Sequence, residues 1–237
     1  MKKKIQIMLL ITVLVAGIRV GYILYERHED NLHSLNKPQP PPLNPDYYVT
    51  PKKLYPYDLK TARQQLMQQP VWVKVGYSIT YYPFRRASRR VDFSHEAGLL
   101  LPLERLEIKD VILQAAPKSP GQRQLMCVFA QEGKEYAFPV GVAQGDNYHF
   151  YVNEMLYIED PHTLYTNWPA DIWDAIDKHE VKPGMSELQA DFAVGLGIPE
   201  GGGDDDQKTL DYANGGKPIK VTYTNGKATE ITNGTSP

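Results

Sequence analysis

The sequence predicts an α+β protein with an N-terminal transmembrane helix, a β-rich small barrel or sandwich, and a module of two helices and a three-stranded antiparallel meander. Three patterns predict this fold class: an apolar run over residues 5–23, short β-branched and aromatic segments over 71–158, and helical spacing of apolar residues after Pro161. The predicted parts are a signal-anchor at 1–25, a proline-rich linker at 26–52, a β-rich domain with a leading short helix at 53–166, and the α+β module at 167–237.

The first segment predicts a membrane anchor. Three lysines, residues 2–4, precede the apolar run over 5–23, which as a helix would span about 29 Å, close to the roughly 30 Å of a bilayer's hydrocarbon core. Basic residues before the span predict a cytoplasmic amino terminus and a single pass through the bacterial inner (cytoplasmic) membrane, with the remainder exported. The alternative is a signal peptide that is cut at residues 15–17, Val-Ala-Gly, and releases the chain into the periplasm. The apolar run continues beyond that point, which favours the anchor.

Composition limits the classes of partner. The chain carries a formal charge of −2, and the part beyond residue 25 carries −6, because the first 25 residues hold three lysines, Arg19 and no acid. A mildly acidic exported part has no general attraction to nucleic acid. One cysteine, Cys127, excludes an internal disulfide and every multi-cysteine metal site. Residues 37–45, KPQPPPLNP, predict an extended polyproline II spacer, with a ligand for a proline-recognition domain as the alternative.

The β-rich domain begins with one predicted helix over residues 58–69, which has Asp58 as its N-cap and Pro70 as its stop. One face of this helix is apolar and is expected to pack onto the β-rich segments after it; it comprises Leu59, Ala62, Leu66 and Met67. Five to seven short strands are then expected, at the spacing of a small antiparallel barrel or sandwich. Pro139 lies inside one of them and predicts an edge or a bulge.

The last module begins with two predicted helices. Pro169 lies near the start of the first, whose apolar face comprises Ile172, Trp173 and Ile176. The second starts at a capping box formed by Ser186 and Gln189, and it stops at Gly197 and Pro199. Its apolar stripe comprises Leu188, Phe192 and Leu196. Three strand-like segments come next, and hairpin turns between them are predicted at Asn214-Gly215 and Asn225-Gly226.

Several motifs of this module occur together over about residues 167–233. They are Val181-Lys182-Pro183-Gly184-Met185-Ser186, Leu188, Leu196-Gly197-Ile198-Pro199, Tyr212, Val221-Thr222-Tyr223, Asn225-Gly226-Lys227, and Thr229 to Ile231. In this order they resemble the SmpA/OmlA family, the small lipoproteins of the outer-membrane β-barrel assembly machinery. The resemblance implies binding rather than chemistry, with an envelope component as partner. The chain departs from the family in two ways, because no cysteine for lipidation follows the apolar run and a β-rich region precedes the module.

Two groups of side chains are candidates for contact with a partner. Residues 84–90, FRRASRR, are the one local basic cluster, and their guanidinium groups suit a phosphate, an anionic glycan or an acidic partner. The alternative for this cluster is a solvated hairpin tip. The chain also has 16 tyrosines against 6 phenylalanines, and tyrosine combines apolar area with a polar group, as at wet interfaces. The candidate contact residues are Arg85, Arg86, Arg89, Arg90, Tyr81, Tyr82, Tyr212 and Tyr223.

No residue is predicted to be catalytic, and no metal or cofactor is expected. Residues 201–206, GGGDDD, lack the spacing of a calcium loop and are expected to form a solvated loop. Asp160, His162 and Glu159 are expected to form a turn with a helix N-cap rather than an acid–base pair or a metal site. Two lone histidines in strand-like surroundings are expected to be structural: His95 and His149. Cys127 is expected to be buried and unreactive.

These patterns favour a non-catalytic, membrane-anchored envelope protein that acts through protein–protein contacts, with assembly of another envelope component as a candidate process. One alternative is a ligand-binding or sensory ectodomain that uses the interior of the β-rich domain. A second alternative is a hydrolase whose site the sequence does not reveal.

Overall fold

The computed structural model describes residues 14–29, 43–76, 78–117, 119–201 and 207–234. It divides into two compact units, Met1–Asn44 and Pro45–Pro237. In the first unit, residues 14–29 form a helix whose side chains are all exposed. Among the described residues, no helix is both long and apolar enough to cross a membrane. The predicted span also includes residues 5–13, which lie outside the described ranges, as do residues 37–42 of the proline run.

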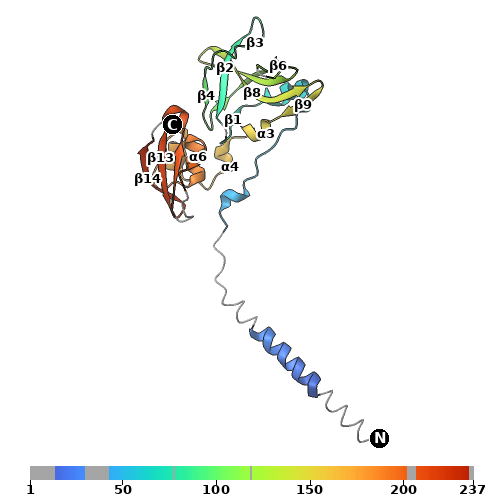
Figure 1. Cartoon of the computed structure of the whole chain (residues 1–237), viewed down its shortest axis with the longest axis vertical. Helices are drawn as coiled ribbons and strands as arrows, with labels where there is room; N and C mark the ends of the chain where they lie inside the picture. The colour runs from blue at the N-terminus through green and yellow to red at the C-terminus, as the bar shows by residue number, and fades with distance from the viewer. Residues whose placement is uncertain (1–13, 30–42, 77, 118, 202–206, 235–237) are drawn as a thin grey trace, which may run out of the picture. The chain divides into compact units, whose positions relative to one another are not determined.

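The second unit contains two antiparallel sheets over residues 71–157 (Figure 1). The larger has seven strands, of which five follow the pairing order β3 (Arg90–Val91), β2 (Ile79–Arg85), β8 (Lys134–Gln144), β7 (Arg123–Gln131) and β6 (Ile108–Ala115). The other two are β4 (Gly98–Leu100), which pairs with β2, and β9 (Asn147–Phe150), which pairs with β8. The smaller sheet has the order β10 (Leu156–Tyr157), β1 (Val71–Val73) and β5 (Arg105–Leu106). In the described chain the larger sheet is therefore open, with β3 and β6 at the ends of its pairing order.

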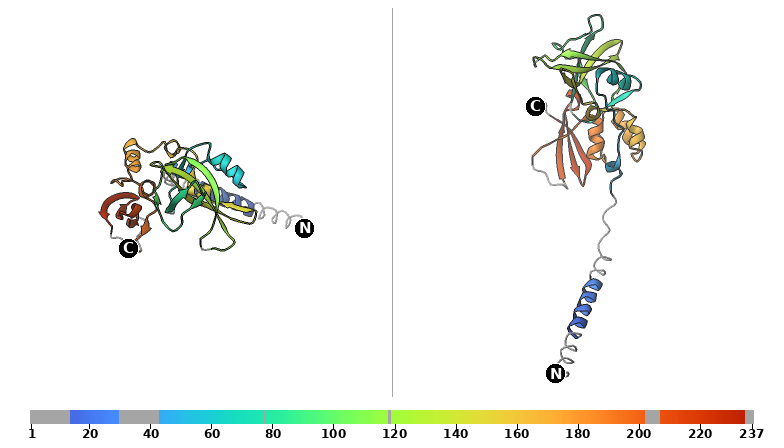
Figure 2. Two further views of the ribbon diagram at one scale, coloured as in Figure 1. Left: turned by 90° about the horizontal axis from the view of Figure 1, so that it is seen from above. Right: turned by 90° about the vertical axis from the view of Figure 1, so that its right-hand side faces the viewer.

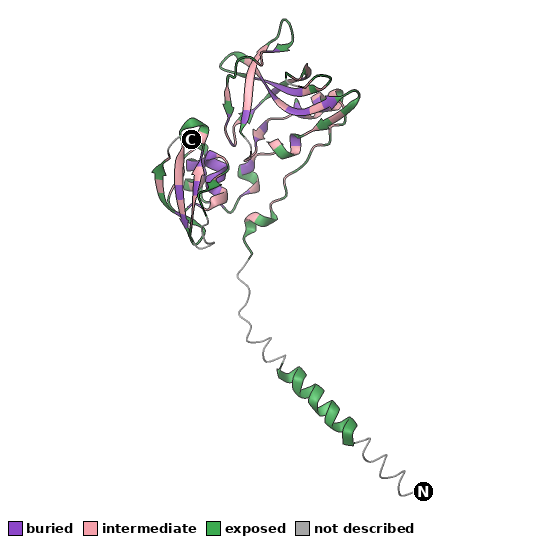
Figure 3. Ribbon diagram, in the orientation of Figure 1, coloured by how far each residue is buried: buried purple, intermediate pink, exposed green. Residues whose placement is uncertain are grey.

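Alternating residues of the larger sheet supply apolar side chains to both of its faces. In β2, Ile79 and Tyr81 belong to the main core, which also includes Val71 and Leu156 of the smaller sheet. Tyr82 belongs to a separate cluster on the opposite face, as expected from the two-residue period of a strand. Figure 3 shows buried residues in the sheet and in α6 (Glu187–Val194). The two sheets thus share one core, and apolar side chains cover part of each face of the larger sheet.

The helix predicted at 58–69 is α2 (Leu59–Leu66), which ends earlier than expected. Asp58 is its N-cap, as predicted: the Asp58 carboxylate accepts the Thr61 N–H at 2.6 Å, and the Thr61 hydroxyl accepts the Asp58 N–H at 3.1 Å. Ala62 and Leu66 are buried, whereas Met67 lies beyond the helix and is 47% exposed. The expected position of Met67 on the buried face is therefore wrong.

The C-terminal part consists of α5 (Ala170–Asp177), α6 and a four-stranded antiparallel sheet. Helix α6 lies against one face of this sheet (Figures 1 and 2). The strands are β11 (Ile198–Pro199), β12 (Gln207–Tyr212), β13 (Ile219–Thr224) and β14 (Lys227–Asn233), paired in that order. The capping box is confirmed, because the Ser186 N–H donates to Gln189 Oε1 at 2.8 Å and the Gln189 N–H donates to Ser186 Oγ at 3.3 Å. This reciprocal bonding fixes the first turn of α6.

Three details of this part differ from the sequence prediction. β11 is a fourth strand, in which Pro199 pairs with Leu210, although Pro199 was expected only to stop a helix. Asn225-Gly226 forms the predicted two-residue turn, whereas Asn214-Gly215 lies in a longer connection that contains η2 (Asn214–Gly216). Leu196 lies beyond the end of α6 and is 51% exposed, because Gly195 leaves the helical conformation with a φ of 96°.

Side chains from both sides of position 167 pack in one core. Tyr157, Tyr165 and Trp168 belong to the same cluster as Trp173 and Phe192. Short elements frame this region: η1 (Pro45–Tyr48), α3 (Val152–Met155) and α4 (Pro161–Leu164). The cluster therefore joins the β-rich part to the C-terminal sheet within the unit Pro45–Pro237.

Candidate functional site

The predicted arginine cluster lies at the hairpin between β2 and β3, where three of its four guanidinium groups pair with carboxylates of the same chain. The pairs are Arg85 with Asp92 at 3.2 Å, Arg86 with Glu135 at 2.9 Å, and Arg89 with Asp110 at 2.6 Å. Arg90 makes no ion pair with the described residues. The arginine side chains of the three pairs are 59–74% exposed, so each pair contributes about 1 kcal/mol or less to stability. The cluster is a hairpin tip whose charge is largely offset locally.

Tyr81 and Tyr82 point to opposite faces of β2. Tyr81 packs edge-on against Phe129 and Tyr136, with ring centroids 5.5 and 5.1 Å apart. Tyr82 packs against Phe93 at 5.2 Å and also lines a cavity beside β2. Burial raises the pKa of both hydroxyl groups. The two residues therefore do not form one contact surface.

Tyr212 and Tyr223 are core residues, so their expected place on an exposed surface is wrong. Each is 1% exposed, and their hydroxyl groups share a hydrogen bond of 2.7 Å. Burial raises the pKa of both groups. The Tyr212 hydroxyl also lowers the pKa of the buried Asp191 carboxyl of α6, so Tyr212 offsets part of the cost of burying that carboxylate.

An apolar cavity lies where β2 and β8 separate. Their pairing consists of Tyr82 with Ala137 and Pro83 with Tyr136. Continuing that register by two residues would place Thr80 opposite Pro139, which has no N–H to donate. The pairing of the two strands ends there, and a space opens between them. We name this space the β2–β8 cavity; its volume is about 640 Å³.

The course of β8 keeps the β2–β8 cavity open. Pro139 pairs with Met126 while Gly141 pairs with Leu125, so Val140 is the extra residue of a bulge, as predicted for Pro139. Beyond the bulge β8 pairs with β9 instead of β2, and Gly141 is required there because a Cβ would overlap the backbone carbonyl oxygen of His149. The chain then enters α3, which covers one end of the gap.

The wall of the β2–β8 cavity combines apolar side chains with one cation. The apolar residues include Val75, Ile79, Tyr82, Pro139, Tyr151 and Met155. Lys74 and Glu154 also line it. The Lys74 ammonium donates to the Asn153 carbonyl oxygen and lies 4.9 Å from the centroid of the Tyr157 ring. Burial lowers the pKa of Lys74, and the nearby Glu154 charge opposes this effect.

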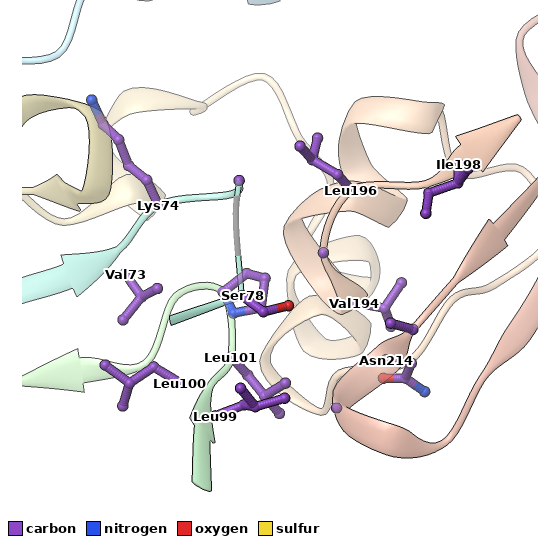
Figure 4. A pocket seen from close by; sticks show the side chains of 15 residues that line it. Val73, Lys74, Ser78, Leu99, Leu100, Leu101, Val194, Leu196, Ile198 and Asn214 are labelled. Atoms are coloured by element: carbon purple, nitrogen blue, oxygen red, sulfur yellow. The ribbon is translucent and has the colours of Figure 1, made fainter. Parts of the chain in front are cut away.

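A smaller cavity of about 160 Å³ lies between residues 99–102 and the loop that follows α6 (Figure 4). Its rim carries three exposed apolar side chains: Leu99 at 42%, Leu196 at 51% and Ile198 at 69% exposure. Lys74 also borders this space, but its Nζ points away from it (Figure 4). The polar groups of the smaller cavity are Ser78 and Asn214.

The histidine and acidic residues form local structure. Asp160 caps α4 as predicted, accepting the His162 N–H at 3.0 Å. The His162 ring lies between Asp160 and Asp177, at 2.8 and 3.3 Å, and stacks on Trp173. Glu159 pairs with Lys52 at 3.0 Å. No group of three potential metal ligands occurs among the residues that the structure describes, and residues 202–206 lie outside them.

Two further predictions concern Cys127 and the lone histidines. Cys127 is fully buried in the main core, as expected, and burial raises its pKa. His95 lies near Asp92 at 3.3 Å, and His149 packs against Tyr151 at 5.0 Å.

Sequence reasoning missed Lys74 and the β2–β8 cavity. The signals were present, since Lys74 is the one charged residue in the apolar segment VWVKV and Pro139 interrupts a strand. No family model, curated protein or solved structure matches this chain, so a function can be proposed only from the geometry of these residues.

Proposed function

We propose that this protein binds an elongated apolar small molecule in the β2–β8 cavity. The observation that carries the proposal is the cavity itself: its volume of about 640 Å³ falls within the roughly 300–1,000 Å³ of typical ligand sites. Its wall is mainly apolar and includes Ile79, Tyr82 and Met155. The proposal adopts the ligand-binding alternative from the sequence, with the β2–β8 cavity in place of the interior of the β-rich domain, and it involves no catalytic step.

The surface first expected to contact a protein partner has less support. Tyr212 and Tyr223 are buried, and three of the four arginines pair with carboxylates of the same chain. A partner that binds the arginine cluster would have to compete with these internal ion pairs. The apolar cavity requires no such exchange, which favours a small-molecule ligand.

The location of the protein is part of the proposal. The apolar residues 5–23 and the lysines before them support a tether in the bacterial inner membrane, with the body exported. Carbonate extraction of membranes tests the tether, and the intact mass of the purified chain distinguishes it from a cleaved signal peptide. Recovery of a shortened chain in the soluble fraction would contradict the tether and support release into the periplasm.

The ligand proposal is tested by blocking the cavity. Thr80 lines it and lies opposite the position where the ladder ends, so Thr80→Trp should fill the space. Thr232→Trp, at an exposed position of β14, is the matched control. The full-length chain and both variants are purified gently, and bound small molecules are extracted and identified by mass spectrometry. A compound recovered near one equivalent from the parent and from Thr232→Trp, and lost from Thr80→Trp, is expected. Equal recovery from all three chains, or none from any, would refute the proposal.

A second candidate function is contact with another envelope protein through the rim of the smaller cavity. Leu99, Leu196 and Ile198 are large, exposed apolar residues that line the same space, and grouped exposed apolar residues are typical of interaction sites. Cross-linking in cells of the full-length chain, with Ile198→Asp compared with Thr232→Asp, tests this idea. A partner retained by Thr232→Asp and lost from Ile198→Asp would support it, and equal recovery with both variants would contradict it.

A further inference from the structure

Lys74 is held by the backbone at the wall of the β2–β8 cavity. It directly follows β1, and its N–H donates to the Met155 carbonyl oxygen at 2.8 Å. This bond joins the end of β1 to the end of α3. The position of the Lys74 side chain between the two elements is therefore set by main-chain contacts rather than by a mobile surface loop.

The charge of Lys74 is only partly compensated. Its Nζ donates one hydrogen bond to the Asn153 carbonyl oxygen and lies over the Tyr157 ring, while an ammonium has three N–H donors. No carboxylate of the described chain forms an ion pair with Lys74, and Glu154 acts on it only through a longer-range charge interaction. A half-buried cation without an ion-pair partner is costly in a protein interior, and a bound anion would reduce that cost.

The cavity wall also limits the number of charges that a ligand can carry. Glu154 lines the same cavity as Lys74; repulsion by its carboxylate grows with each negative charge on a head group, whereas Lys74 supplies only one positive charge. A single negative charge can pair with Lys74, while a chain of methylene groups contacts the apolar residues Ile79, Tyr82, Pro139 and Met155.

We propose that the ligand of the β2–β8 cavity is a single-chain amphiphile with one carboxylate, and that Lys74 binds its carboxylate group. This inference rests on the proposed function, and it adds the chemical class of the ligand. It also assigns Lys74 a binding role that distinguishes a carboxylate from a neutral head group of the same chain length.

The test uses the full-length chain in lipid nanodiscs with Nile red, a neutral polarity-sensitive dye. The fluorescence of Thr80→Trp is subtracted from that of the parent. The difference reports dye bound in the cavity, because dye dissolved in the lipid contributes equally to both samples. Dodecanoate and dodecanol are then compared as competitors. Because a hydrogen bond to a charged group contributes about 1.5–3 kcal/mol, we expect dodecanoate to displace the dye at a concentration about tenfold or more below that of dodecanol.

Variants of Lys74 separate the inference from the proposed function. Lys74→Met should remove the preference for dodecanoate and leave dodecanol unchanged, whereas Lys74→Arg should retain the preference. Lys53→Met, which removes an exposed charge close enough to influence Lys74, is the control and should behave as the parent. If Lys74→Met does not fold, as judged by circular dichroism, the comparison uses Lys74→Gln, which keeps a donor for Asn153.

Two results would count against the proposals in different ways. Equal displacement by dodecanoate and dodecanol from the parent would overturn the carboxylate inference and leave the cavity as an apolar site. The absence of any dye signal sensitive to Thr80→Trp would overturn both proposals.

Discussion

Replacing Asp191 by asparagine is expected to stabilise the folded body at pH 7 and to flatten its stability profile in acid. Asp191 lies in α6 and is 9% exposed. Burial raises its pKa to about 6, and the nearby Glu187 carboxylate adds to this effect. The Gly197 N–H, which Asp191 Oδ1 accepts at 3.3 Å, the Tyr212 hydroxyl and the Lys208 charge act in the opposite direction. The folded state is therefore less stable with Asp191 ionised than with Asp191 protonated.

The magnitude follows from the two pKa values. In the unfolded chain Asp191 has its ordinary pKa of 3.8, against about 6 in the folded state, a difference worth about 3 kcal/mol. Because the folded pKa is the higher one, this stability is present below pH 3.8 and is lost as the pH rises through 6. Asparagine stays neutral, so Asp191→Asn should recover about 1–3 kcal/mol at pH 7, less what its unpaired amide N–H groups cost.

The assay is urea unfolding of the full-length chain between pH 4 and 8, followed by tryptophan fluorescence, since Trp168 and Trp173 lie in the same core as α6. The difference between the parent and Asp191→Asn removes the contribution of other carboxylates. Asp174→Asn, at an exposed position of α5, is the control for the same substitution outside the core. A constant difference in stability between the parent and Asp191→Asn across this pH range would show that burial of Asp191 does not raise its pKa as described.

Two further changes test the packing around the sites. Gly141→Ala should destabilise the body by about 3 kcal/mol or more in urea unfolding, because its Cβ would overlap a backbone carbonyl oxygen of β9; an unchanged midpoint would contradict the observed β8–β9 approach. Tyr223→Phe should cost about 1–2 kcal/mol, because it removes the hydrogen bond between the buried Tyr212 and Tyr223 hydroxyl groups. A double-mutant cycle with Tyr212→Phe should give a non-zero coupling, and strict additivity would show that the bond contributes nothing.

The local structure of the chain could be predicted where short-range chemistry decides it. Asp58 and Ser186 cap their helices as expected, since a side-chain oxygen three residues before a free N–H suffices for a cap. Asn225-Gly226 forms its two-residue turn because both residues adopt positive φ, 51° and 72°. The α+β class, with several antiparallel sheets, followed from the change in hydrophobic period.

Burial of particular side chains could not be predicted in the same way. Tyr212 and Tyr223 were placed on a surface because tyrosine tolerates water, yet each finds a polar partner in the core through the pairing of β12 with β13 and the approach of α6. Leu196 was placed on a buried stripe because it continues the helical spacing, yet α6 ends two residues earlier. For the two tyrosines the deciding contacts come from segments distant in sequence, whereas the exposure of Leu196 follows from the conformation of its neighbour Gly195.

Local sequence was enough to determine the caps, the tight turn, the mixed helix and strand content and the burial of Cys127, because these depend on neighbouring residues and on apolar character. The β2–β8 cavity, in contrast, exists only in the folded chain. It requires the pairing of β2 with β8 to end at Tyr82 and Ala137, Gly141 to accept the close approach of β9, and α3 to bring the Asn153 carbonyl oxygen to Lys74. Register and strand order bring these residues together over long separations in the chain, and no local pattern encodes that arrangement.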